Sequence, residues 1–150
     1  MSNLENFSGK VAIVTGSSSG IGAATAIHFA QFGGRVVITG RNQEKLQKVF
    51  DECIKAAREN FGTVIQFIGD VINVEFCKKL IKTTIETFGK IDILVNNAGL
   101  AIQSSIYDEK LLTNYDKMMD INLKSIVVLT QLAVPYLEQT KGVIVENREN

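Results

Sequence analysis

Three glycines follow a short apolar run near the start of the chain, in the segment Thr15-Gly16-Ser17-Ser18-Ser19-Gly20-Ile21-Gly22. Gly16 can take the turn at the end of a strand, Gly20 lets backbone N–H groups approach a pyrophosphate, and Gly22 lets a helix pack close to that strand. The start of the helix adds free N–H donors and a partial positive charge. The segment therefore predicts a phosphate-binding turn, with a merely structural strand–helix turn as the alternative.

Short apolar runs and helical patterns alternate along the chain and must position this turn. Runs rich in β-branched residues predict strands, and apolar residues three or four positions apart predict helices. The expected strands are Lys10–Thr15, Arg35–Thr39, Thr63–Ile68, Ile91–Val95 and Gly142–Val145. The expected helices are Gly20–Phe32 (apolar at Ile21, Ala24 and Ile27), one after the N-cap Asn42 (Leu46, Val49, Cys53, Ala57), one carrying Val74, Cys77, Ile81, Ile85 and Phe88, and Asn114–Leu137.

Alternation of this kind indicates an α/β fold, with a parallel sheet covered by helices on both faces. Right-handed crossovers then predict a doubly wound, Rossmann-type sheet with the strand order 3-2-1-4-5. No repeat or linker interrupts the pattern, so we expect residues 1–150 to form a single domain.

Composition excludes several classes of partner. The 150 residues carry 16 basic and 16 acidic side chains, so the formal net charge is zero. Without a basic field, we expect no nucleic acid and no membrane as a partner. The two cysteines, Cys53 and Cys77, occupy apolar helical positions and are interpreted as core residues, and no His/Cys cluster has metal spacing. The acidic N-terminus does not look like a signal peptide, so we expect a cytoplasmic protein without a metal site.

Three further segments stand in register with the glycine-rich turn: Gly69-Asp70-Val71, Asn96-Asn97-Ala98-Gly99 and Asp120-Ile121-Asn122. With these four motifs the chain resembles the short-chain dehydrogenase/reductase family in its classical form, from Lys10 to about Val145. Thr15 to Gly22 matches the family's glycine motif, and Asp120-Ile121-Asn122 matches the segment with its catalytic asparagine. The resemblance implies that Asp70 and Val71 flank the adenine, that Asn97, Ala98 and Gly99 line the cofactor site, and that Asn96 ties the fourth strand to the first through the Thr15 hydroxyl.

The end of the second strand, Thr39-Gly40-Arg41-Asn42, bears on the choice of nicotinamide cofactor. Enzymes that use NAD place an acidic residue here to bind the ribose 2′-OH, and in this family it usually occupies the position of Gly40. Arg41 can instead pair with a 2′-phosphate. We therefore expect NADP(H) to be preferred, with NAD(H) as the alternative. A solvated Arg41 at a strand–helix corner is the competing interpretation.

The family's hydride transfer uses a serine and a Tyr-x-x-x-Lys pair together with the asparagine. The chain has three tyrosines, and the residues four positions after them are Leu111, Met119 and Thr140. The family pattern also stops at Glu146, where the serine is expected. Only Asn122 remains of the catalytic positions. The resemblance therefore implies a chain truncated after the fifth strand, incomplete at its C-terminal side and catalytically incompetent alone.

Such a chain acts on a small-molecule carbonyl or alcohol substrate only if another part completes it. Without the family's next helix, we expect Met118, Ile126 and Leu129 to face water, so that the helix 114–137 becomes an association surface. A non-catalytic cofactor-binding or interaction module that regulates a full-length relative is the second hypothesis. A working enzyme with unfamiliar proton donors, or one completed by another chain, is the third. The substrate stays open.

Overall fold

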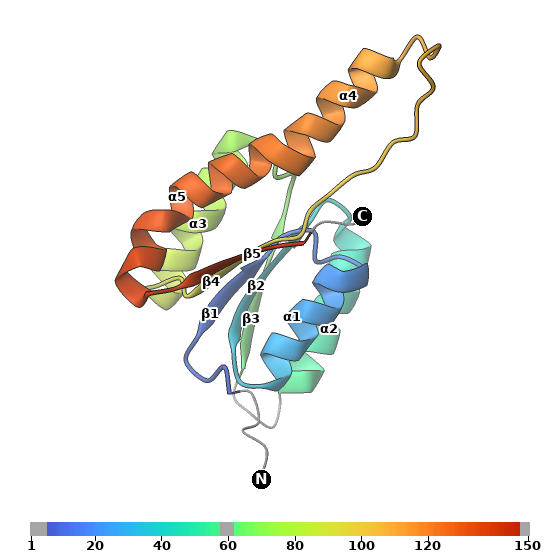
Figure 1. The fold of residues 1–150 in the computed structure, drawn as a ribbon. Helices are drawn as coiled ribbons and strands as arrows, with labels where there is room; N and C mark the ends of the chain where they lie inside the picture. Colours follow the sequence, from blue (N-terminus) through green and yellow to red (C-terminus); the bar gives the residue numbers. More distant parts are fainter. Residues whose placement is uncertain (1–5, 58–61, 148–150) are drawn as a thin grey trace.

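The computed structural model describes residues 6–57 and 62–147, in which strands and helices alternate as expected (Figure 1). The strands are β1 (Val11–Val14), β2 (Arg35–Gly40), β3 (Thr63–Ile68), β4 (Ile93–Asn96) and β5 (Val143–Glu146). The helices are α1 (Gly20–Gln31), α2 (Gln43–Ala57), α3 (Val74–Phe88), α4 (Leu111–Met119), the π-helical turn η1 (Asp120–Lys124) and α5 (Ser125–Thr140).

The strands form one parallel sheet in the order β3-β2-β1-β4-β5. The central strand β1 pairs on both sides, so that Ala12 lies between Val36 of β2 and Ile93 of β4. The order reverses direction between β1 and β4. The doubly wound α/β fold and its strand order are therefore confirmed.

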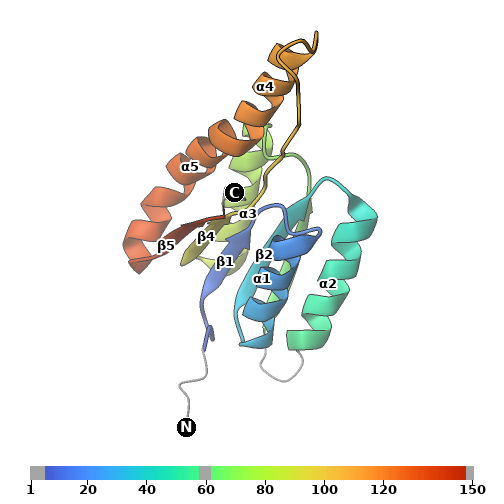
Figure 2. The same cartoon turned by 45° about the vertical axis from the view of Figure 1, so that its right-hand side comes forward.

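Helices cover both faces of the sheet: α1 and α2 lie on one face, and α3 and α5 lie on the other (Figure 2). Successive residues of a strand point to opposite faces, and β1 follows this rule. Ala12 and Val14 belong to the core beneath α1 and α2, whereas Ile13 belongs to the core beneath α3 and α5. Burial on both faces explains why β1 is apolar at every position.

The buried face of α1 differs from the predicted one. Ile21, Ala24 and Ile27 were expected to mark the apolar face, but Ile21 is 55% exposed and Ala24 is also exposed. The buried residues are instead Gly22, Ala23, Ala26 and Ala30, while Ile27 is partly buried and packs against the same core, as expected. Because the buried residues are small, α1 can approach β1 closely, and the larger Ile21 points outward at the start of the helix.

The predicted helix 114–137 is longer and less regular than expected. It runs from Leu111 through η1 to Thr140, and its first part projects beyond the sheet (Figure 1). The expectation that Leu129 faces water is wrong, because Leu129 is 1% exposed in the core against α3. Met118 and Ile126 are half-buried. The large apolar residues that do face water along this helix are Leu112, Tyr115, Leu123 and Val127.

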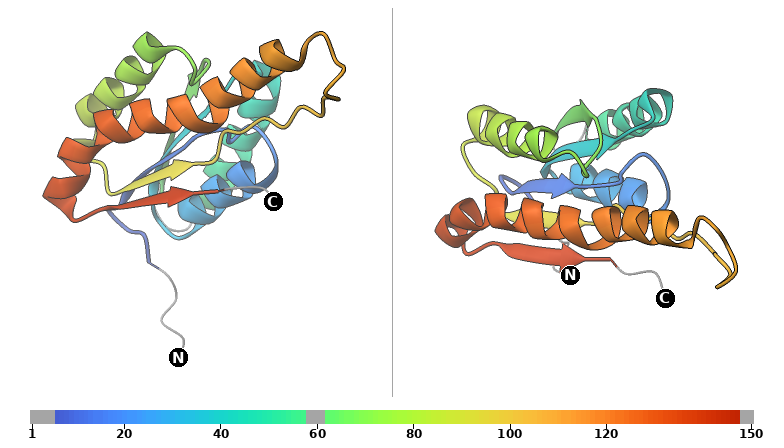
Figure 3. Two further views of the ribbon diagram at one scale, coloured as in Figure 1. Left: turned by 45° about the horizontal axis from the view of Figure 1, so that its top comes forward. Right: turned by 90° about the horizontal axis from the view of Figure 1, so that it is seen from above.

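Strand β5 forms one edge of the sheet within the described residues (Figure 3). It pairs only with β4, and Val143, Ile144 and Val145 are all exposed. By the register with β4, Val143 and Val145 face the side of α1, and Ile144 faces the side of α5. This edge is the least covered part of the sheet.

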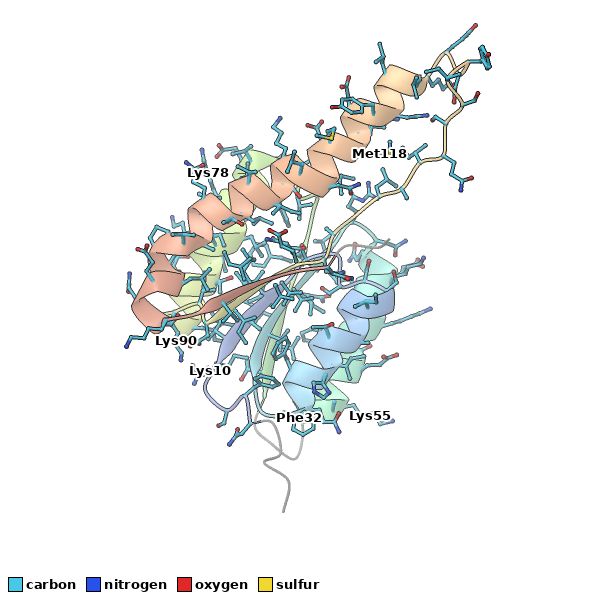
Figure 4. All side chains as sticks on the ribbon, in the orientation of Figure 1. Lys10, Phe32, Lys55, Lys78, Lys90 and Met118 are labelled. Carbon is cyan, nitrogen blue, oxygen red and sulfur yellow. The ribbon has the colours of Figure 1, made fainter. Side chains whose placement is uncertain are left out.

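Buried Asp92 holds the amino ends of β1 and β4 together. Its carboxylate accepts a hydrogen bond from the Val11 N–H at 2.8 Å, and Lys90 and Lys10 approach it at 3.0 and 3.4 Å. Both lysines lie at this end of the sheet (Figure 4). Burial by itself raises the pKa of Asp92, but the Val11 hydrogen bond and the two lysines outweigh it and hold the pKa below its ordinary value.

Candidate cofactor site

A cavity of about 290 Å³ opens at the carboxyl ends of β1, β2 and β4, where the strand order reverses. Open α/β sheets bind their ligands at this position. The residues around the cavity come from the glycine-rich turn, the end of β2, the segment after β3 and the segment after β4. They are Gly16, Ser18, Ser19, Gly20, Ile21, Thr39, Gly40, Arg41, Gly69, Asp70, Val71, Asn97, Ala98, Gly99 and Ile121.

Backbone conformation and close packing explain why the first turn contains glycines. Gly16 and Gly20 have φ angles of +62° and +57°, in the left-handed region that glycine adopts most readily. A Cβ on Gly16 would lie 2.7 Å from the Cα of Ala98. A Cβ on Gly22 would collide with the side-chain amide of Asn97. The turn therefore packs directly against the segment after β4, and no larger residue fits at these two positions.

The start of α1 faces the cavity without a side chain that caps it. Its N-cap residue, Ser19, makes no side-chain hydrogen bond to the helix, and the first turn contains no acidic residue. The first N–H groups of a helix have no partner within the helix itself. Their donors and the positive end of the helix dipole are therefore available to an anion in the cavity.

Thr15 and Asn97 hold the glycine turn and the end of β4 together. The Thr15 hydroxyl accepts hydrogen bonds from the N–H groups of Asn97 and Ala98, both at 3.0 Å. The Asn97 side-chain nitrogen donates to the carbonyl oxygens of Thr15 and Gly16 at 3.0 and 3.1 Å. The expectation that Asn96 makes this link is wrong, because its amide points instead toward Thr130, at 3.5 Å.

Four of the expected cofactor residues lie around the cavity lining and not in it. Ser17 is fully buried under the turn, where its hydroxyl donates to the Val14 carbonyl and accepts from the Thr39 N–H. Asn42 lies before α2 and accepts from the Lys45 N–H at 2.9 Å, as an N-cap does. Thr15 and Gly22 support the turn from behind. These four residues shape the cavity without facing it.

Arg41 is the basic residue of the lining, and its guanidinium lies 3.7 Å from the carboxylate of Asp70. The Arg41 side chain is 66% exposed, so this ion pair stabilises the fold little. Gly40 lies beside it, and a Cβ there would meet Ser18 Oγ at 2.9 Å. The lining thus presents one exposed positive charge, and a side chain at position 40 would require Ser18 to shift.

Thr39 and Ile121 also line the cavity, although sequence reasoning did not single them out as site residues. Thr39 is hidden in the alternation of β2, where it was interpreted only as a strand residue. Ile121 lies in the π-helical turn, 8% exposed, and reaches the cavity from the long helix. Its position between Asp120 and Asn122, in a motif that resembles the family's, could have identified it as a site residue.

Asn122 lies beside the cofactor cavity, at the rim of a second and larger one. Its side-chain oxygen accepts from the Leu100 N–H, and its nitrogen donates to the Leu100 carbonyl, both at 2.8 Å. The second cavity measures about 990 Å³ and is bordered by residues 97–101 after β4, by the outer face of η1 and α5, and by the end of β5. The two cavities share Asn97, Ala98 and Gly99, so they adjoin along the segment after β4.

Other groups that could do chemistry lie elsewhere. Tyr107 and Tyr115 are exposed, Tyr136 packs into the core beside α3, and none of the three lines either cavity. Cys53 and Cys77 are buried free thiols, which confirms their interpretation as core residues. In residues 6–57 and 62–147 no group of three or more metal-binding side chains comes together. Across the same residues, no helix has the length and apolar character to span a membrane.

Three known proteins illustrate what this chain resembles in sequence and structure. The chain is 38% identical to an 11-beta-hydroxysteroid dehydrogenase-like protein of Arabidopsis thaliana over 143 residues, which are 95% of this chain and 46% of the relative. A metagenomic short-chain oxidoreductase in complex with NADP superposes with a TM-score of 0.85 at 32% identity, over 93% of this chain and 62% of that one. An NADH-dependent reductase complexed with NAD superposes with a TM-score of 0.82 at 28% identity, over 93% and 59%.

The chain thus spans about half the length of the curated relatives that it matches. The model of the short chain dehydrogenase family matches residues 10–147, nearly the whole chain. That match agrees with the strand order and with the glycine-rich turn at the reversal of the sheet. The protein belongs to the short-chain dehydrogenase family of oxidoreductases.

Proposed function

We propose that this chain binds NADP(H) at the cavity beside β1 and forms the cofactor-binding portion of an oxidoreductase. The observation that carries the proposal is the cavity itself. It joins two left-handed glycines, an uncapped helix start and Arg41 at the reversal of the sheet. Bound nicotinamide would supply hydride exchange with a carbonyl or alcohol carbon. The chain's own residues bind and orient that cofactor.

The lining supports one orientation of a dinucleotide. The glycine turn and the start of α1 would hold the pyrophosphate with backbone N–H groups. Asp70 and Val71, at the far side of β2, would flank the adenine. Ala98 and Gly99 line the cavity with a methyl group and a hydrogen atom, and they would lie against a ribose. In this orientation the nicotinamide points toward the shared wall of the two cavities, near Asn122.

The end of β2 supports NADP(H) over NAD(H). Position 40 is a glycine and therefore carries no carboxylate that would bind a ribose 2′-OH or repel a 2′-phosphate. Arg41 sits next to that position with a guanidinium that can turn from Asp70 to a phosphate. A 2′-phosphate would therefore lie near the positive charge of Arg41. The nearby carboxylate, that of Asp70, already faces Arg41.

We further propose that this 150-residue chain does not turn over a substrate by itself. None of its tyrosines lines a cavity or precedes a lysine by four positions. Both polar atoms of the Asn122 amide are already bonded to Leu100. A small-molecule carbonyl or alcohol would be reduced or oxidised only when a further segment supplies the proton donor. We infer a single domain of residues 1–150, since no repeat or linker interrupts the alternation of strands and helices. We also infer a cytoplasmic location, which agrees with the free thiols of Cys53 and Cys77.

A non-catalytic module that associates with a longer relative is the second candidate function. The exposed apolar side chains of the helix from Leu111 to Thr140 favour it, namely Leu112, Tyr115, Leu123 and Val127. The bare edge of β5 adjoins the same surface across the larger cavity. Such a surface would serve association and would not require turnover.

A titration of the purified chain with NADPH and NADH, followed by nicotinamide fluorescence and calorimetry, tests the first proposal. We expect NADPH to bind with a Kd of about 1 μM, near −8 kcal/mol, and NADH to bind at least tenfold more weakly. A folded chain that binds neither cofactor would refute the proposal. Equal affinity for both cofactors would refute only the proposed role of Arg41 and would leave dinucleotide binding itself supported.

A further inference from the structure

Asn147 lies directly after β5 and reaches the residue that holds the glycine-rich turn. Its side-chain nitrogen donates a hydrogen bond to Asn97 Oδ1 at 2.8 Å. Its backbone N–H donates to the carbonyl oxygen of Asn96 at 3.1 Å, which continues the β4–β5 ladder by one residue. The ladder therefore fixes the main chain at Asn147, and the side chain is presented to Asn97.

The polarity of this contact follows from the groups around Asn97. Its side-chain nitrogen donates to the carbonyl oxygens of Thr15 and Gly16. Carbonyl oxygens only accept hydrogen bonds, so the NH₂ group of Asn97 must face the turn and its oxygen must face away. Asn147 supplies a donor at that oxygen. The three residues form a directed chain of hydrogen bonds from the end of β5 to the first glycine of the turn.

The position of Asn97 matters because the glycine-rich turn packs tightly against the segment after β4. Gly16 sits against Ala98 so closely that even a Cβ would lie 2.7 Å from the Ala98 Cα. Asn97 lines both cavities, and Asn147 lines the larger one. A shift of Asn97 by a fraction of an ångström would therefore move the turn that faces the cofactor cavity.

We propose that Asn147 is a positioning residue for the dinucleotide site. Through Asn97 it holds Gly16 in place, so that the backbone N–H groups of the turn stay aimed at the cavity. This inference rests on the proposed function as far as the ligand is concerned. It also couples the end of β5 to the cofactor site, two parts of the structure that no backbone hydrogen bond joins directly.

Substitution of Asn147 by valine removes the donor and leaves the main-chain bond. The expected result is a Kd for NADPH about three to ten times higher than in the wild type, the loss of one hydrogen bond. Asn114→Val is the matched control, because the Asn114 amide also donates to a side chain, Ser104 Oγ at 2.8 Å, away from the cavity. We expect Asn114→Val to bind NADPH as the wild type does. Wild-type affinity in Asn147→Val, or an equal loss in the control, would overturn the proposal.

Substitution of Asn147 by aspartate gives a readout that simple destabilisation does not. An ionised carboxylate cannot donate to Asn97 Oδ1, whereas a protonated carboxyl can. A carboxyl group with an ordinary pKa of about 3.9 becomes half protonated only near pH 4. We therefore expect the ratio of the variant's Kd to the wild type's, measured with NADP⁺ by calorimetry, to fall from pH 7.5 to pH 4. A ratio that does not change with pH contradicts the contact.

Hydrogen exchange in the absence of ligand separates this inference from the proposed function. The Ser17 N–H in the turn donates to the Thr39 carbonyl at 3.0 Å and reports how firmly the turn is held. In Asn147→Val we expect this amide to exchange about threefold faster or more, with little change in the control. If the wild type binds no dinucleotide, the proposed function fails, and this exchange rate still decides whether Asn147 positions the turn. Unchanged exchange would overturn the inference.

Discussion

The side-chain hydroxyl of Thr15 accepts a hydrogen bond from the backbone N–H of Asn97 at 3.0 Å, across 82 residues of sequence. The same oxygen accepts from the Ala98 N–H and lies 3.3 Å from the carbonyl oxygen of Val95, to which it can donate. One buried hydroxyl thus organises the point where β1 ends and β4 ends. Because the cofactor cavity begins at this point, the contact belongs to both the fold and the site.

Thr15→Val should destabilise the chain, since it removes the acceptor of the Ala98 N–H and leaves the Asn97 N–H with only the Val95 carbonyl at 3.1 Å. We expect a loss of about 2 kcal/mol or more in the free energy of unfolding, measured by urea denaturation. Thr15→Ser keeps the hydroxyl and should lose less than half as much. Equal losses in the two variants would mean that the methyl group of Thr15 contributes as much as its hydroxyl, which would contradict the dominant role of the hydroxyl.

Gly16→Ala should abolish dinucleotide binding. The substitution combines an unfavourable φ of +62° with a Cβ that lies 2.7 Å from the Cα of Ala98. Gly89→Ala is the control, because Gly89 has a φ of +77° but open space around its Cβ position. We expect Gly89→Ala to lose about 1 kcal/mol of stability and to bind NADPH normally in a fluorescence titration. Similar binding by both variants would contradict the packing of the turn.

Arg41→Ala should weaken NADPH binding about tenfold, a change of about 1.4 kcal/mol, and leave NADH binding unchanged within about twofold. The physical reason is that only NADPH carries the 2′-phosphate that the guanidinium would meet. Calorimetric titrations with both cofactors measure the difference. Lys82→Ala removes an exposed positive charge from α3 and serves as the control for the change in net charge. A parallel loss of NADH affinity would argue against a phosphate contact.

Asp92 should make stability depend on pH in a defined direction. Its pKa is held below the ordinary value in the folded chain. Its contribution is therefore fully present above the unfolded pKa of about 3.9 and is lost as the pH falls through the folded pKa. Asp92→Asn should be less stable than the wild type by about 1 to 2 kcal/mol at pH 7, and the difference should shrink at pH 3.

Urea denaturation at the two pH values measures this difference. Glu75→Gln provides the comparison, because Glu75 pairs with Lys78 at 2.7 Å on the surface of α3. An exposed pair of this kind contributes little, so its removal should change stability by about 0.5 kcal/mol or less. A larger effect at Glu75 than at Asp92 would contradict the assignment of Asp92 as the anchor of the two strands.

Cys53 and Cys77 should resist alkylation in the folded chain. Burial raises the pKa of Cys53 to about 12 and that of Cys77 to about 11, with the charges of Glu52 and Asp70 adding to the effect. Since the thiolate is the reactive form, both thiols should be nearly inert to iodoacetamide at pH 8. Mass spectrometry should find label only after denaturation in urea. Rapid labelling of the native chain would show that the cores around α2 or α3 open readily.

The strands, the turn and the strand order could be predicted from the sequence. Apolar runs such as Val11–Val14 are buried on both faces. Their sequence alone therefore predicts strands covered by helices on both sides. The glycines of the first turn are likewise local: a left-handed φ at Gly16 and Gly20 and close packing at Gly22 are requirements that residue type expresses directly. The glycine-rich turn predicted part of the cofactor lining, whereas Asp70, Val71, Asn97, Ala98 and Gly99 were expected only from the family resemblance.

Which residue touches which was decided only by the tertiary structure. Asn96 and Asn97 have the same side chain, and the alternation of a strand end sends one toward Thr130 and the other toward the glycine turn. The buried face of α1 consists of Gly22, Ala23, Ala26 and Ala30, whose small size lets the helix lie close to the sheet, and the apolar pattern alone did not identify this face. The contact from Asn147 to Asn97 joins residues 50 positions apart and depends on the register between β4 and β5. Local patterns determine what each segment becomes, whereas hydrogen bonds between distant side chains exist only after the sheet has set their positions.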